Sequence, residues 1–179
     1  MSKFLVIAEK PSVAQSYAKN LSAYKREDGY LEGESCIVSW CLGHLAEYAQ
    51  PEEYDPKYEK WQFDDLPILP EAWKLKVSKD KKKQFEVIKT LMNRSDVEYL
   101  VNGCDAGREG ELIFQRVYVL AGCRKPVKRL WISSMEDAAI QKGFQTMKSE
   151  EEYKNLCMAA VCRAQADWLI GMNGTRAYT

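Results

Sequence analysis

The feature that most constrains the fold is an apolar run leading directly into an acidic, glycine-rich turn. The run is Val97–Val101, and the turn is Asn102–Glu111, which reads Asn-Gly-Cys-Asp-Ala-Gly-Arg-Glu-Gly-Glu. The run predicts a buried strand, and the helical spacing of the apolar residues that follow predicts a helix. Ligands bind at the carboxyl edge of open α/β sheets, so Asp105, Glu109 and Glu111 are predicted to lie at such an edge.

Three carboxylates in one turn repel one another unless a cation joins them. Mg²⁺ takes oxygen ligands, often one or two carboxylates together with water molecules, so the turn is a candidate magnesium site. The alternative is a solvated acidic turn in which Glu109 and Glu111 favour the N-terminus of the following helix. Gly103, Gly107 and Gly110 permit a tight backbone in either case. The segment by itself leaves both interpretations open.

A second strand-to-helix junction also carries an acid. The apolar run Phe4–Ala8 ends at Glu9, Lys10 and Pro11, and Pro11 suits the first turn of a helix. In a parallel sheet the two junctions open at the same edge, so we expect Glu9 to lie near the acidic turn. Glu9 would serve there as a metal ligand or a general acid, and Lys10 would hold a phosphate. The alternative is an ordinary exposed pair of opposite charges.

Strands and helices alternate along the chain, which predicts an α/β fold with a parallel sheet flanked by helices. The four prolines of Gln50–Pro70 predict an extended connection. A capping-box pattern begins a helix at Ser133. From Tyr153 the apolar spacing predicts one long helix, and because no later segment covers it, we expect a fragment of a longer protein. Further strands are predicted at Tyr30–Glu34, Cys36–Leu42, Trp73–Val77 and Lys128–Ile132, and a further helix from Ser78 or Asp80 through Arg94.

Composition narrows the classes of function. The formal net charge is zero, so total charge argues neither for nor against nucleic-acid binding. The lysines of residues 71–94 predict either a local basic face or a solvated helix surface. The six cysteines form no Cys-x-x-Cys pair and the one histidine, His44, is expected to be structural, so zinc is disfavoured. Without a signal peptide or an apolar run of bilayer length, we expect reduced thiols and a cytoplasmic location.

Two motifs, Ile7–Ser12 and Asp105–Glu111, together resemble the Toprim domain. Three further stretches are similar to bacterial topoisomerase III, a branch of the type IA DNA topoisomerases: Trp61–Pro67, Arg129–Ser133 and Arg163–Thr179. The resemblance covers the whole chain, and the closing stretch is the part that is specific to type IA.

This resemblance implies an enzyme that needs no ATP. Type IA topoisomerases bind single-stranded DNA, cut one strand through a tyrosine, pass another strand and reseal, and the tyrosyl phosphodiester conserves the energy of the broken bond. The resemblance also implies a Rossmann-like Toprim domain over residues 1–150 and the first helix of the next domain, truncated here, over residues 151–179. The remaining topoisomerase domains would then follow Thr179.

The resemblance carries over to individual residues. Glu9 matches the glutamate that acts as acid and base beside Mg²⁺, and Lys10 matches the lysine that faces the phosphate. Asp105 and Glu109 match the first and third acids of an Asp-x-Asp-x-Glu motif, and with Glu9 they form the expected magnesium site. Gly107 replaces the middle acid, which leaves one or two magnesium ions open. The residues expected to contact single-stranded DNA are Lys10, Trp61, Arg163, Asp167, Trp168 and Arg176.

The nucleophilic tyrosine of the family has no match in this chain, because it lies in a later domain. Tyr178 belongs to the closing stretch and does not correspond to it. We therefore expect the N-terminal part of a topoisomerase that is inactive by itself. One alternative is a stand-alone Toprim nuclease or primase-like protein that uses metal-activated water. Another is a non-catalytic module that binds nucleic acid or nucleotide.

Overall fold

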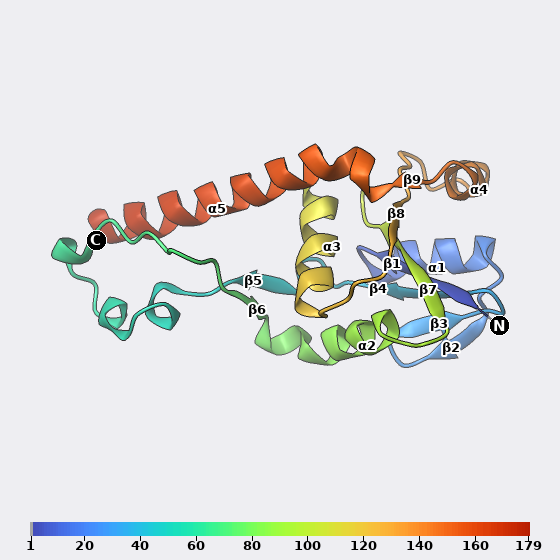
Figure 1. The fold of residues 1–179 in the computed structure, drawn as a ribbon, viewed down its shortest axis with the longest axis horizontal. Helices are drawn as coiled ribbons and strands as arrows, with labels where there is room; N and C mark the ends of the chain where they lie inside the picture. The colour runs from blue at the N-terminus through green and yellow to red at the C-terminus, as the bar shows by residue number, and fades with distance from the viewer. Residues whose placement is uncertain (1) are drawn as a thin grey trace.

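A computed structural model describes residues 2–179 and contains a seven-stranded mixed sheet flanked by helices (Figure 1). The strand order is β2-β3-β4-β1-β7-β8-β9. The four central strands run parallel, and antiparallel strands extend the sheet on both sides. The predicted parallel sheet is thus confirmed at its centre. The strands are β1 (Lys3–Ala8), β2 (Lys25–Glu27), β3 (Tyr30–Glu32), β4 (Cys36–Trp40), β7 (Val97–Gly103), β8 (Val127–Arg129) and β9 (Lys148–Ser149).

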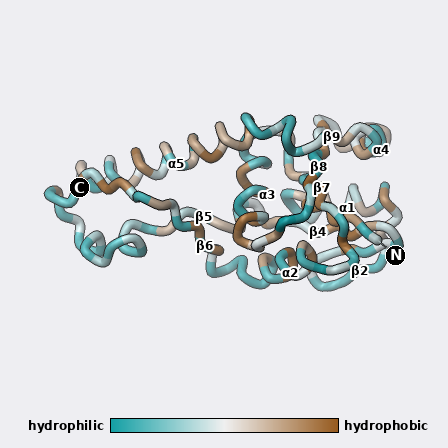
Figure 2. The backbone as a smooth tube through the Cα atoms, viewed as in Figure 1, coloured by the Kyte–Doolittle hydropathy of each residue, from teal (hydrophilic) through white to brown (hydrophobic). Residues whose placement is uncertain are grey.

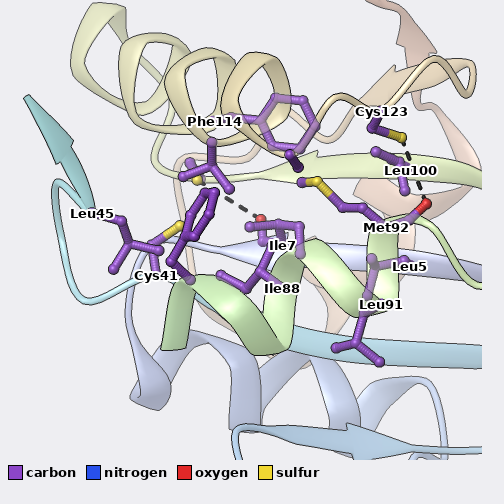
Figure 3. Packing of buried hydrophobic residues seen from close by; sticks show 14 of the residues in the cluster. Leu5, Ile7, Cys41, Leu45, Ile88, Leu91, Met92, Leu100, Phe114 and Cys123 are labelled. Atoms are coloured by element: carbon purple, nitrogen blue, oxygen red, sulfur yellow. Dashed lines mark hydrogen bonds between the residues drawn. The ribbon is translucent and has the colours of Figure 1, made fainter. Parts of the chain in front are cut away.

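Helices cover both faces of this sheet. Strand β1 lies between β4 and β7 and is buried on both sides, which is why it reads as a continuous apolar run. Leu5 and Ile7 pack with α2 and α3, as Figure 3 shows, and Val6 and Ala8 pack with α1 and α4. The helices are α1 (Pro11–Asn20), α2 (Lys82–Met92), α3 (Arg108–Leu120), α4 (Asp137–Gln145) and α5 (Lys154–Ala177).

Local signals set several helix ends. Pro11 occupies the first turn of α1, as predicted. Helix α3 ends just before Gly122, whose φ of +63° suits a glycine C-cap. The predicted start of α4 is wrong: the Ser134 hydroxyl accepts a hydrogen bond from the Glu136 amide in a turn, and the helix begins at Asp137. The capping-box spacing therefore forms a local turn that precedes the helix.

A long segment leaves the sheet and joins α5 to form what we call the arm, residues 46–77 together with α5. Strands β5 (Ala46–Tyr48) and β6 (Leu75–Val77) form a separate antiparallel pair at its base. The connection between them is mainly hydrophilic in Figure 2. The sequence predicted an extended connection. The structure differs, because this segment contains short 3-10 helices at Pro51–Glu53, Pro56–Glu59 and Phe63–Asp65.

Helix α5 is covered by this earlier segment, whereas the prediction considered a partner only among later segments. Trp168 is buried against Tyr54 and Trp73 and donates through Nε1 to the Ala49 carbonyl at 3.0 Å. The amide side chain of Asn173 exchanges two hydrogen bonds with the backbone of one residue of the connection, Ile68. The arm is therefore a packed unit with its own small aromatic cluster.

All six cysteines are free thiols. Over residues 2–179, no helix combines the length and the hydropathy that crossing a bilayer requires.

Candidate functional site at the carboxyl edge of the sheet

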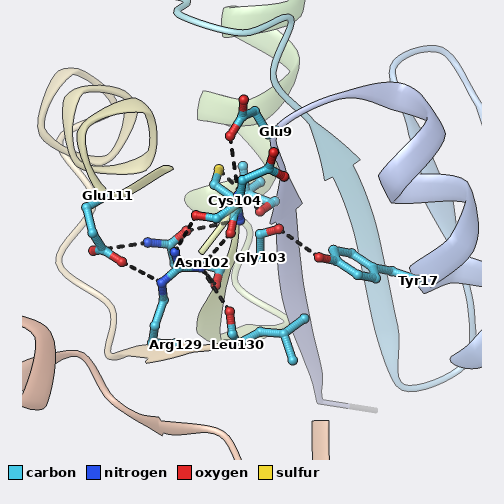
Figure 4. A network of polar contacts seen from close by, with 10 residues as sticks. Glu9, Tyr17, Asn102, Gly103, Cys104, Glu111, Arg129 and Leu130 are labelled. Atoms are coloured by element: carbon cyan, nitrogen blue, oxygen red, sulfur yellow. Dashed lines mark hydrogen bonds and ion pairs between the residues drawn. The ribbon is translucent and has the colours of Figure 1, made fainter. Parts of the chain in front are cut away.

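The two acid-bearing junctions meet at one edge of the sheet. Ala8, the last residue of β1, pairs with Gly103 of the parallel strand β7. Glu9 and the acidic turn therefore leave the sheet side by side, and the Asp105 amide donates to Glu9 Oε2 at 3.3 Å (Figure 4). The predicted convergence of Glu9 with the acidic turn is confirmed.

Lys10 stands at the N-cap of α1 and is exposed. Unpaired backbone N–H groups and the helix dipole make a helix N-terminus favourable for anions. The lysine charge adds to that field. An anion approaching Glu9 would therefore meet positive potential from Lys10 on one side and carboxylates on the other.

Glu109 lies in the first turn of α3 and contacts the chain's histidine. His44 Nε2 and Glu109 Oε2 are 3.2 Å apart, and both side chains are exposed to solvent. The histidine is held in its loop by Lys81, whose Nζ donates to the His44 carbonyl at 2.8 Å. The expectation that His44 would be only structural missed this contact, because nothing in the sequence links the end of β4 to the start of α3.

The third acid of the turn does not face solvent. Glu111 is buried and its Oε1 accepts from Arg129 Nε at 2.5 Å, with both side chains at most 2% exposed. The idea of three free carboxylates crowded together is therefore wrong for Glu111. Its charge is neutralised inside the protein, and of the three acids of the turn only Asp105 and Glu109 are exposed.

The turn packs closely on the first turn of α3. A Cβ atom added to Gly110 would lie 2.0 Å from the Asp105 carbonyl oxygen, a distance that no side chain tolerates. Glycine at this position is what allows the helix to begin beside the acidic turn.

The sequence matches the Toprim domain family over residues 4–135. The chain belongs to the Toprim domain family. It is 51% identical to DNA topoisomerase 3 of Bacillus subtilis and of Bacillus cereus, over all of this chain and 25% of each relative. The chain thus spans about a quarter of the length of these curated relatives.

A solved structure supports the same fold. Full-length topoisomerase I from Thermotoga maritima matches with a TM-score of 0.53 and 20% identity, over 84% of this chain and 22% of that chain. At this identity the match supports the fold and nothing further. The fold expected from the sequence, a Toprim sheet with flanking helices and a long C-terminal helix, is confirmed.

The acids of this Toprim domain suit a hard cation by their chemistry, but they are not gathered into a cage. Within residues 2–179, no group of three or more His, Cys, Asp or Glu side chains converges closely enough to hold a metal ion. Glu109 contacts His44, while Glu9 contacts the Asp105 backbone. This arrangement fits a site with one or two carboxylate ligands and several waters, which is a usual form of magnesium binding.

Two side chains beside the Toprim acids are not available as nucleophiles. Tyr17 is buried and donates to the Gly103 carbonyl at 3.0 Å, and burial raises the pKa of its phenol. The pKa of the Cys104 thiol is raised well above its usual range. The larger cause is a side-chain hydrogen bond with the neighbouring Cys41, and the next is burial. Both groups therefore stay protonated at neutral pH, and nucleophilic attack requires the deprotonated or activated form.

A surface hollow adjoins the acidic turn of the Toprim domain. Its volume is about 320 Å³, and it lies between Asp105 and the loop that follows β8. The Ser133 and Ser134 residues and the side chain of Met135 help to line it. The hollow therefore offers polar and apolar surface next to the Asp105 carboxylate.

The residues expected to bind DNA are divided between two environments. Arg163 and Asp167 form an exposed ion pair on α5, with Nε and Oδ2 3.6 Å apart. Trp61 is half-exposed at 52% on the connection of the arm. These three side chains are accessible from solvent, as the prediction requires.

Trp168 and Arg176 are packed within the arm, and their contact with single-stranded DNA stays a prediction. Trp168 is 8% exposed inside the aromatic cluster of the arm. The Arg176 side chain is 6% exposed, donates to the Tyr58 carbonyl at 2.8 Å and lies over the Trp61 ring at 5.1 Å. Both residues hold the connection onto α5.

Proposed function

We propose that this chain is the Toprim part of a type IA DNA topoisomerase, of the topoisomerase III branch. The observation that carries the proposal is the meeting of Glu9 and Asp105 at adjacent parallel strand ends. The identity of 51% to DNA topoisomerase 3 over all 179 residues supports it. Because the chain spans a quarter of that relative, the nucleophilic tyrosine and the other domains would belong to a longer protein.

The chain's own residues would prepare a phosphodiester for attack by that tyrosine. Lys10 would bind the phosphate, and Glu9 would exchange a proton with the attacking or leaving oxygen. Asp105 and Glu109, with Glu9 nearby, would hold Mg²⁺, which supplies positive charge that stabilises the phosphate during transfer. The hydrogen bond from the Asp105 amide fixes one oxygen of Glu9.

The arm would continue the path of single-stranded DNA away from the acids. Arg163 offers an exposed guanidinium for phosphates, and Trp61 an exposed ring for base stacking. We infer a Toprim domain over residues 1–150 and the start of the next domain over residues 151–179. The connection of residues 49–74 packs on α5, so it would move together with that next domain. The free thiols agree with a cytoplasmic location.

A chimera tests this function. This chain would replace the matching quarter of DNA topoisomerase 3 from Bacillus subtilis, and relaxation of negatively supercoiled plasmid would be followed with magnesium. We expect relaxation by the chimera. Glu9→Gln should lower the rate by about 10²–10⁴-fold, while the free energy of unfolding changes by less than about 0.5 kcal/mol, as at other accessible positions.

Glu98→Gln is the matched control, because Glu98 is exposed on β7 away from the acidic turn. It should relax plasmid at the unmodified rate. Relaxation that survives Glu9→Gln would contradict the acid and base role. Residues 1–179 alone should bind single-stranded DNA weakly, more weakly with added salt, and form no covalent adduct. Adduct-free nicking by the isolated chain would favour a metal-dependent nuclease instead.

A further inference from the structure

Beneath the acidic turn lies Arg129, which begins one of the stretches that resemble topoisomerase III but to which the sequence assigned no role. Arg129 is the last residue of β8, and its side chain is 1% exposed. The Trp131 ring covers the guanidinium, whose central carbon lies 5.0 Å from the ring centre. Arg129 is the largest fully buried side chain of residues 2–179, so its contacts are shielded from water.

The guanidinium of Arg129 donates hydrogen bonds to backbone carbonyls of the acidic turn (Figure 4). Nη1 donates to the carbonyls of Asn102 at 3.0 Å and Cys104 at 2.6 Å. Nη2 donates to the Asp105 carbonyl at 2.8 Å. The Asn102 carbonyl also accepts from the Leu130 amide at 3.0 Å, so it keeps a donor without the arginine. For the carbonyls of Cys104 and Asp105 the guanidinium supplies the donor, and a buried carbonyl that loses its donor is costly.

The same guanidinium also fixes the start of α3. Its Nε donates to Glu111, whose other carboxylate oxygen lies 3.4 Å from the side-chain nitrogen of Asn102. Glu111 follows Glu109 by two residues in the first turn of that helix. One planar cation is therefore bonded to the backbone that carries Asp105 and to the helix turn that carries Glu109.

We propose that Arg129 is a positioning residue that sets the relative placement of Asp105 and Glu109. The planar, five-donor fork of arginine reaches both the turn and the carboxylate, whereas lysine has a single point charge and cannot reproduce this pattern. The proposal rests on the magnesium-binding role proposed above for these acids. The new element is that the magnesium affinity of the site depends on Arg129, a buried residue that contacts no ligand.

A second arginine provides a matched control. Arg94 also bridges two acids, with Nη2 2.9 Å from Glu32 and 2.7 Å from Asp96. It lies three residues before β7, at the opposite end of that strand from the acidic turn. Arg94→Lys should therefore weaken the fold without disturbing the acidic turn.

The experiment compares residues 1–179 unmodified and as Arg129→Lys, Arg94→Lys and Glu111→Gln. Amide hydrogen exchange over residues 103–106 reports the turn, and chemical shifts during a titration with magnesium chloride report the site. For Arg129→Lys we expect exchange about tenfold faster in the turn and magnesium binding weakened by about tenfold or more. Arg94→Lys should leave both readouts unchanged, even where it lowers the urea midpoint.

If Arg129→Lys fails to fold, Glu111→Gln decides, because it keeps the arginine and the side-chain shape and removes only the partner's charge. It should accelerate exchange in the turn in the same direction. Unchanged exchange in the turn for whichever variant folds, or equal changes in Arg94→Lys, would overturn the positioning role. If the unmodified chain shows no magnesium shifts, the proposed function fails, while the exchange comparison still decides the role of Arg129.

Discussion

The acid edge of the sheet and the arm use their polar side chains in opposite ways. At the acid edge, Glu9, Asp105 and Glu109 remain accessible, and a buried arginine holds the backbone beneath them. In the arm, Trp168 and Arg176 are turned inward to join two segments of the chain. The acid edge therefore presents carboxylates that a ligand can reach, whereas polar and aromatic side chains of the arm are buried in contacts within the chain.

This difference predicts that substitutions in the arm change mainly the stability of the fold, whereas substitutions of the exposed acids change mainly ligand binding. Neutralising an exposed acid at the edge removes little packing. Truncating an inward residue of the arm removes the contacts that make the arm a unit. The next two predictions test this contrast through the free energy of unfolding, and a third tests a carboxylate that lies outside both regions.

The largest effect is expected for Trp168→Ala. Its indole is surrounded by Tyr54 and Trp73, and its N–H is bonded to the Ala49 carbonyl. Removing a buried tryptophan costs about 3–5 kcal/mol, and we expect the lower part of that range because the cluster is small. Urea unfolding followed by circular dichroism measures it. Trp61→Ala, at a half-exposed ring, is the control and should cost at most about 1 kcal/mol. Equal costs for the two would break the contrast.

A smaller loss is expected for Gly110→Ala at the acid edge. The added methyl would lie 2.0 Å from the Asp105 carbonyl, so the turn or the helix must shift. Overpacking of this kind costs about 1–3 kcal/mol. Gly171→Ala in α5 is the matched control, since an added Cβ there meets nothing within 4 Å. It should stabilise the helix by about 0.5–1 kcal/mol. Opposite signs in thermal melts would sharpen the contrast, and a gain at Gly110 would refute the packing argument.

The smallest effect concerns acid pH and neither region directly. Hydrogen bonding to Arg94 lowers the pKa of Asp96 from 3.8 to about 2. Because the folded pKa is depressed, this contribution is complete above about pH 4 and is lost as the pH falls toward 2. The pair is partly exposed, so it contributes less than about 1 kcal/mol. Asp96→Asn should flatten the dependence of the urea midpoint on pH in this window. If Asp96→Asn leaves the dependence of the urea midpoint on pH unchanged, Asp96 is not the source of that dependence.

Much of the fold followed from local patterns in the sequence. The apolar runs before Glu9 and Asn102 predicted β1 and β7, and Pro11 predicted the start of a helix. The meeting of Glu9 with the acidic turn followed from parallel pairing alone. These features are predictable because each depends on residues that are neighbours in sequence or in a regular sheet.

The remaining features depend on contacts that have no local signature. Strands β2 and β5 have three residues each, too few to show a periodicity. The resemblance marked the stretch that begins at Arg129, but the role of this arginine depends on its carbonyl partners, which the sequence does not indicate. Trp168 and Arg176 lie on a helix whose buried face is chosen by a segment more than 100 residues earlier. Spacing identified the helix but could not identify which of its residues face that segment.

The pairing of β1 with β7 has a consequence for how the site comes into being. Glu9 and Asp105 are 96 residues apart in sequence, so an unfolded chain holds them together only after it has closed a long loop. Non-local pairings of this kind form slowly compared with helices and hairpins. A ligand held by both acids therefore binds only chains in which this pairing has formed. Its binding free energy adds to the stability of the central strands and resists their separation.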